Sequence, residues 1–213
     1  FKNVNSESDN SSEYKNSLSS NINGLFEFNT SLPLIKKESK YTKVITPKAS
    51  FRFNPRKTKN KKNEVRLIGY DNIFDFNRLG ISDTLEGGES ITYGASYSLN
   101  NQSNRQVFSA SLANVFRIEE DNNMPLSSSL GQKTSNVVST IKMNPNDILK
   151  IDYQHSFDEN LSDTKYQLLS SEISINNFLT SFEYLNESAD SANNSYLYNK
   201  TSYKFDENNL ISF

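Results

Sequence analysis

The amino-acid sequence predicts an all-β protein, an antiparallel up-and-down transmembrane β-barrel with about ten strands in this chain. Three observations predict this fold class. Apolar and polar residues alternate along most of the chain, the alternating segments are long, and short and long connections alternate between them. We therefore expect about ten strands and no helix in residues 1–213.

The N-terminal part of the chain contains the clearest alternation. Residues 1–13 are rich in Ser, Asn, Asp and Glu and are expected to form a loop, and a weakly alternating strand follows at 16–32. Residues 43–54 place on one face Ile45, Pro47, Ala49, Phe51 and Phe53. Residues 90–99 place on one face Ile91, Tyr93, Ala95, Tyr97 and Leu99. A helix would mix these residues with the intervening Ser, Thr and Gly, so the pattern predicts strands.

The same pattern continues toward the C-terminus. Apolar residues share one face in 106–118, with Asn114 as an exception, and again in 148–157. Weaker alternation predicts further strands at 135–144, 166–176, 178–186 and 196–205, and from Leu210 onward. The clear segments exceed the usual strand length of about 5–6 residues. They match the roughly 9–11 residues that a tilted strand needs to cross a bilayer.

The connections between these segments alternate in length. Those expected to be tight or short lie at residues 33–42, 100–105, 144–147, 176–177 and 206–209. The longer ones lie at residues 55–89, 119–134, 158–165 and 187–195. Up-and-down membrane barrels have short periplasmic turns and longer extracellular loops. A soluble extracellular β-sandwich gives the same strand alternation but no such alternation of loops, so it remains the less favoured alternative.

Composition agrees with a strand-based wall. The chain has 34% hydrophobic residues and a mean hydropathy of −0.69, so no stretch is apolar enough for a helical membrane span. Aromatic residues make up 12% of the chain, more than a disordered protein contains. It has no Cys and a net charge of −2, which exclude disulfides and give no overall attraction to nucleic acid. Because the chain begins at Phe1, we expect a fragment of a longer protein.

One part of the sequence is more specific than the barrel pattern. Residues 46–50 read TPKAS, and the long connection contains DNIFDFNRLG at 71–80 and DTLEGG at 83–88. The next strand carries TYG at 92–94, and PLSSSL follows at 125–130. This order resembles the barrel domain of the LPS-assembly outer-membrane protein family LptD, in its alphaproteobacterial form.

The resemblance covers about residues 32–157 and is most specific between 71 and 97. The sequence departs from the family pattern at Ser129, where Gly is common, and at Asn136, where Asp is common. The periplasmic N-terminal domain of the family has no counterpart in these residues. The family barrel is far larger than ten strands. The resemblance therefore implies that residues 1–213 form part of one outer-membrane β-barrel domain, about ten strands of a larger barrel.

The resemblance implies a function in the Gram-negative outer membrane. A protein of this type inserts lipopolysaccharide (LPS) into the outer leaflet, with a lipoprotein plug similar to LptE in its lumen. It receives LPS from a periplasmic LPS-bridge protein, makes or breaks no bonds, and is therefore not an enzyme. Another outer-membrane barrel, such as a porin or nutrient channel, is the alternative within the same fold class.

The long connection 55–89 supplies the first set of candidate residues. We expect Arg78 to form charge-assisted pairs with Asp83, Glu86 and Glu89 that fold the loop back into the barrel mouth. Phe74 and Phe76 are expected to anchor it on the inner wall, and the glycines allow unusual backbone angles. A solvated surface loop is the alternative, although long structured loops are often functional. The candidates in this family-motif loop are Asn72, Phe74, Asn77, Arg78, Gly80, Asp83, Glu86, Gly87 and Gly88.

Basic residues supply the second set of candidates. The run at 56–62 could contact phosphates or sugars of neighbouring LPS, although a solvated loop is slightly favoured, and nucleic acid is not expected outside the cell. Cations on the polar face of the strands would line the lumen and a possible LPS path. They are Lys48, Arg52, Lys142, Lys150 and Lys200. No catalytic motif, metal site or cofactor site is expected.

Overall fold

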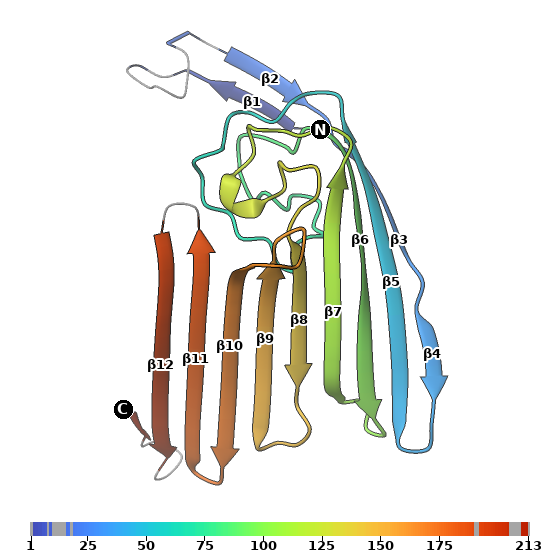
Figure 1. Cartoon of the computed structure of the whole chain (residues 1–213), viewed down its shortest axis with the longest axis vertical. Helices are drawn as coiled ribbons and strands as arrows, with labels where there is room; N and C mark the ends of the chain where they lie inside the picture. Colours follow the sequence, from blue (N-terminus) through green and yellow to red (C-terminus); the bar gives the residue numbers. More distant parts are fainter. Residues whose placement is uncertain are drawn as a thin grey trace.

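The computed structural model describes residues 2–7, 9, 16–17, 19–189, 192–204 and 210–212. A two-stranded sheet near the N-terminus pairs β1 (Lys2–Ser6) with β2 (Ser19–Asn23). The rest of the described chain is dominated by one sheet of eleven strands (Figure 1). They are β3 (Phe26–Ser31), β4 (Leu34–Lys37), β5 (Tyr41–Asn54), β6 (Gly88–Asn101), β7 (Gln106–Arg117), β8 (Val137–Met143), β9 (Leu149–Phe157), β10 (Thr164–Ile175), β11 (Phe178–Ala189), β12 (Ala192–Lys204) and β13 (Leu210–Ser212).

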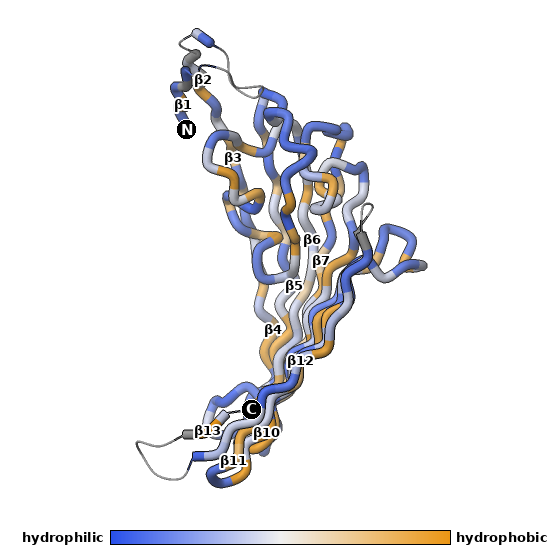
Figure 2. Tube along the Cα trace, turned by 90° about the vertical axis from the view of Figure 1, so that its left-hand side faces the viewer, coloured by the Kyte–Doolittle hydropathy of each residue, from blue (hydrophilic) through white to orange (hydrophobic). Residues whose placement is uncertain are grey.

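The large sheet has up-and-down topology. From β5 to β13 each strand pairs antiparallel with the next one in the chain, and β3 and β4 lie end to end along the other edge of β5. The eleven strands form a single curved layer, not the two face-to-face sheets of a sandwich (Figures 1 and 2). The predicted all-β, antiparallel, up-and-down arrangement is thus confirmed, and the sandwich alternative is wrong.

Several predicted boundaries need correction. Residues 1–13 were expected to form a loop, but Lys2–Ser6 is a strand. The single strand expected at 16–32 is divided into β2 and β3, and the connection expected at 33–42 contains β4. The long connection expected at 187–195 is instead mostly strand, because β11 and β12 remain paired up to Ala189 and Ala192. Residues 205–209, including the predicted end of the 196–205 strand, lie outside the described residues.

The two faces of the sheet differ in chemistry. In β5, Phe51 is 43% exposed whereas its neighbour Arg52 is 1% exposed. We call the face that carries Arg52 the inner face and the face that carries Phe51 the outer face. Strand register places on the outer face a row of largely apolar partners, Ile141, Tyr153, Leu169, Tyr184 and Leu197. The alternation in the sequence therefore corresponds to two distinct surfaces.

The long connections gather at one end of the sheet. Residues 55–87 and 118–136 fold together over the inner face at the upper ends of β5 to β9 (Figure 1). Short connections join the strands at the opposite end, as the sequence predicts. Hydrophobic residues are prominent in the part of the strands that lies far from the long loops, and the loop region is mostly hydrophilic (Figure 2). The only helix among the described residues is η1 (Leu126–Ser128), so none found there has the length or hydrophobicity to span a membrane.

Candidate functional site

The two long loops share a small hydrophobic core with the inner face of the sheet. Loop 55–87 and loop 118–136 both bury side chains against β7 and β8. The buried cluster comprises Ile73, Leu79, Ile81, Ala113, Val115, Met124, Leu130 and Val138. Burial of apolar surface stabilises a folded loop in the same way as a protein core, at about 25 cal/mol per Å². The structure therefore shows the long loop folded onto the inner wall, as the sequence predicts.

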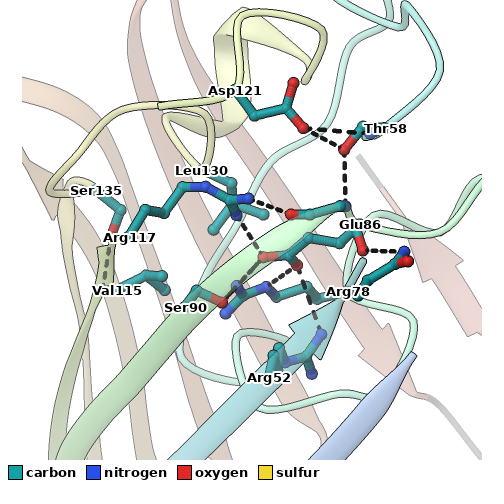
Figure 3. A network of polar contacts seen from close by, with 12 residues as sticks. Arg52, Thr58, Arg78, Glu86, Ser90, Val115, Arg117, Asp121, Leu130 and Ser135 are labelled. Atoms are coloured by element: carbon teal, nitrogen blue, oxygen red, sulfur yellow. Dashed lines mark hydrogen bonds and ion pairs between the residues drawn. The ribbon is translucent and has the colours of Figure 1, made fainter. Parts of the chain in front are cut away.

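Glu86 is the centre of a buried ionic network beside this core (Figure 3). Its side chain is 4% exposed, and Arg78 donates two hydrogen bonds to it, at 2.6 Å from Nε and 2.5 Å from Nη2. Arg117 Nη1 lies 2.7 Å from the same carboxylate, and Arg52 Nη1 lies 3.5 Å from it. One carboxylate from the loop thus joins guanidinium groups from the loop, from β7 and from β5.

The network keeps Glu86 ionised. Burial raises the pKa of this carboxyl, but the charges of Arg78, Arg117 and Arg52 and the hydrogen bond from Arg78 outweigh burial. The pKa is lowered from 4.5 to about 2. Glu86 precedes β6 and lies outside the strands, so this charge belongs to the loop end of the sheet.

The positive charge of the network exceeds its negative charge. Arg52 also pairs with Glu27 of β3 at 3.2 Å, so three guanidinium groups face two carboxylates. Backbone carbonyl groups accept from the arginines and compensate for part of the excess. These acceptors belong to Ile73, Asp75, Phe76, Gly87 and Glu119. Arg78 further donates to Thr92 Oγ1 at 2.7 Å and to Ser90 Oγ at 3.1 Å, which fixes it against β6.

The second loop is tied to the first by hydrogen bonds. Thr58 Oγ1 donates to Asp121 Oδ2 at 2.6 Å and accepts from the backbone N–H of Gly87 at 2.8 Å. The backbone N–H of Lys61 donates to the carbonyl of Asn123 at 2.7 Å. Asp121 and Thr58 are therefore structural partners that position Glu86 through its neighbour Gly87 (Figure 3).

Several candidates in the family-motif loop have a structural position that explains their residue type, whereas exposed Asn77 contributes only its backbone carbonyl. Asn72 Oδ1 accepts from Gly69 N at 3.0 Å, the carbonyl of Asn77 accepts from Gly80 N at 2.9 Å, and Phe74 packs against the core. Gly80 and Gly88 have φ of 68° and 74°, where a side chain is disfavoured. A Cβ on Gly87 would lie 2.4 Å from Arg56 O and Thr58 N.

Other expected contacts of this loop are wrong. Arg78 pairs with Glu86 but not with Asp83, which instead lies 3.2 Å from Lys61 and 3.6 Å from Lys59. No pair forms between Arg78 and Glu89. Phe76 is 51% exposed and does not anchor the loop. These differences arise because Arg78 and Glu86 are both directed toward the sheet, whereas Asp83 faces the basic segment.

The basic run at 56–62 is partly folded into the loop. Thr58 is 3% exposed and Lys61 5% exposed, so these two residues pack inside the loop. Lys57 and Lys62 are exposed. The expectation of a uniformly solvated run therefore holds for only part of it.

The five predicted lumen cations all lie on the inner face, but most have partners. Arg52 belongs to the buried network, and Lys48 Nζ lies 5.5 Å and 5.6 Å from the ring centroids of Tyr70 and Phe74. Lys142 lies 3.4 Å from Asp152 and 3.8 Å from Asp71, and Lys150 lies 2.7 Å from Glu172. Lys200 is exposed and pairs in register with Ser181. Their role in an LPS path remains a prediction.

Sequence reasoning missed three participants in the network, namely Arg117, Glu27 and Asp121. Arg117 could have been found from the sequence, because it is a charged residue that follows two apolar residues, Ala113 and Val115, on the same face of a strand. A charge in that position needs a partner. Glu27 and Asp121 had no local signal, because their partners are distant in the sequence.

A single-layer antiparallel sheet, with an apolar outer face and loops packed on a polar inner face, defines this chain as part of a β-barrel wall. The family model of LptD, LPS transport system D, matches residues 2–210. The chain therefore belongs to the LptD family, and the predicted resemblance and fold class are confirmed. No curated protein matches the chain.

Proposed function

We propose that this chain forms part of the outer-membrane translocon that inserts LPS into the outer leaflet. The observation that carries the proposal is the buried Glu86 network, which holds the family-motif loop against the inner face of a barrel wall. Such a loop narrows the passage at the end where the long loops lie. LPS is proposed as the cargo because the chain belongs to an LPS transport family.

The two faces of the sheet suit the two parts of the cargo. The inner face carries Ser, Thr and paired charges, which are compatible with hydrated sugars. The outer face carries exposed Phe, Leu, Ile and Tyr, which are compatible with lipid. We place the long-loop end outside the cell, a periplasmic LPS-bridge protein at the opposite end, and a lipoprotein plug similar to LptE in the lumen. The protein itself performs no bond chemistry.

Conditional depletion of the protein tests this function. LPS exposed at the cell surface should fall as the protein is lost, and expression of the wild-type protein should restore it. Arg78→Ala should restore surface LPS less well, because the loop loses its central ion pair, whereas Glu120→Gln, at an exposed position, should restore it fully. Unchanged surface LPS after depletion would exclude the LPS-assembly function and favour another barrel function, such as a porin.

A further inference from the structure

A groove separates the two folded loops from the inner face of β8 to β11. Its cavity volume is about 410 Å³. Four residues form the floor, namely Val138, Ser156, Tyr166 and Glu187. They are consecutive cross-strand partners, so they form one straight row across four strands. We call this cavity the inner groove.

The roof of the inner groove consists of the two loops. Residues between 62 and 68 line it on one side, and residues 126–129 line it on the other. The backbone N–H of Arg66 donates to Ser127 Oγ at 2.8 Å, and Ser127 Oγ donates to the Arg66 carbonyl at 3.3 Å. The roof is therefore a bonded structure, and the groove is formed before any ligand arrives.

Part of the polar lining of the groove hydrogen-bonds to the protein, as the serine hydroxyl groups at 127–129 and 135 do, and part of it does not. The side chains of Asn63, Gln132, Asn136, Ser156 and Tyr166 all line it. None of them hydrogen-bonds to another described residue through its side chain, whereas the buried hydroxyl groups of the network are all bonded. Amides and hydroxyls both donate and accept, so they suit a ligand that carries many hydroxyl groups.

The charges of the lining balance. Lys62 and Lys165 supply two positive charges, and Glu64 and Glu187 supply two negative charges. A groove for phosphate would carry an excess of positive charge. The apolar side chains of Leu67 and Leu126 and the ring of Tyr166 provide surfaces for C–H groups. A volume of 410 Å³ lies within the range of about 300–1,000 Å³ that is typical of small-ligand sites.

We propose that the inner groove binds an uncharged sugar segment of a glycan as it passes the loop end of the barrel. This inference rests on the proposed function, because LPS is the glycan-bearing cargo. Tyr166 stacks on a sugar ring, and Ser156, Asn136 and Glu187 exchange hydrogen bonds with its hydroxyl groups. The Glu86 network joins loop 55–87 to β5 and β7, holds the roof in place and does not contact the sugar.

Calorimetric titration of the detergent-purified protein with core oligosaccharide, freed of lipid A and dephosphorylated, tests the inference. Saturable binding is expected, nearly independent of salt. Tyr166→Ala should weaken it about tenfold, which corresponds to about 1.4 kcal/mol. Tyr153→Ala is the matched control, because Tyr153 lies on the outer face of the adjacent strand. Ser156→Val should also weaken binding. Heat-modified migration in gels would verify that each variant is folded.

Three results would overturn the proposal. They are the absence of saturable binding by the wild-type protein, equal binding by folded Tyr166→Ala and Ser156→Val variants, or competition by inorganic phosphate with a steep dependence on salt. Failure of this proposal can be distinguished from failure of the proposed LPS-assembly function. If the oligosaccharide does not bind but depletion still lowers surface LPS, only the groove assignment fails. If it binds but depletion leaves surface LPS unchanged, the groove is a glycan site in a protein of different function.

Discussion

At the scale of single residues, Glu86 connects three separate segments of the chain. Its carboxylate faces Arg78 of the same loop, Arg52 of β5 and Arg117 of β7. Removal of one partner from a buried ionic group is costly, because the remaining charges stay buried without compensation. Glu86 is therefore the residue whose loss should most disturb the attachment of the loop.

Glu86→Gln should loosen loop 55–87 by about 3–5 kcal/mol, since three buried guanidinium groups would keep only one carboxylate, that of Glu27. Trypsin should then cleave at basic residues of this loop at a much higher rate, while the strands stay protected. The exposed residue Glu120, changed to Gln, is the control. Equal cleavage of the two variants would show that the network does not hold the loop.

The lowered pKa of Glu86 predicts a dependence on acid. A carboxyl whose pKa is lower in the folded state contributes stability that is complete above its unfolded pKa and is lost as the pH falls through the folded pKa. With values of 4.5 and about 2, this contribution should be intact at neutral pH and should decline between about pH 4.5 and pH 2. Hydrogen exchange of the loop at stepwise lower pH measures it. A Glu86→Gln variant should show less change over this range, and an equally steep change would assign the effect to other carboxyls.

At the scale of elements, the start of β6 depends on the close approach of two backbone segments. A Cβ on Gly87 would lie 2.4 Å from Thr58 N, a contact that cannot form without a backbone shift. Gly87→Ala should therefore release the loop without any change of charge, with a loss of protease resistance similar to that of Glu86→Gln. Gly69→Ala, where an added Cβ meets nothing within 4 Å, should leave cleavage unchanged. Resistance of both variants would contradict this role.

The two long loops are coupled through the hydroxyl group of Thr58. Thr58→Val removes the hydroxyl bonds to Asp121 Oδ2 and to the backbone N–H of Gly87, and leaves buried polar groups unpaired at a cost of about 1–3 kcal/mol. We expect faster hydrogen exchange in both loops, not only in the loop that carries the substitution. Thr58→Ser retains the hydroxyl group and should restore protection. If exchange increases in loop 55–87 alone, the loops fold independently.

The strands could be predicted from sequence because a period of two residues is a local signal. Residues 43–54 and 90–99 correspond closely to β5 and β6. The loop contacts were less accessible, because Arg117 and Asp121 are distant in sequence from their partners. Ser129 shows a partial signal, since it stands where the family often has Gly and it adopts a left-handed φ of 53°. The charge of Arg78 was visible, but its choice of Glu86 over Asp83 depends on the fold.

At the scale of the whole molecule, the sheet separates two environments with one layer of residues. Neighbouring positions in one strand belong to different environments, as Leu169 and Ser170 of β10 illustrate. Leu169 pairs with Tyr153 and Tyr184 on the outer face, whereas Ser170 pairs with Asp152 and Glu183 on the inner face. The barrel interpretation thus predicts that Leu169 faces lipid and that its neighbour Ser170 faces the lumen.

An arginine at each of these two positions tests this interpretation directly. Leu169→Arg places a charge toward lipid and should reduce the free energy of folding into phospholipid vesicles by about 2–4 kcal/mol. Ser170→Arg places the same charge beside two inner-face carboxylates and should change it by less than about 0.5 kcal/mol. Urea titration of the vesicle-inserted protein measures both. Because the two substitutions lie at adjacent positions of one strand, a larger loss for Ser170→Arg would reverse the assignment of faces. Equally small losses would show that neither face contacts lipid.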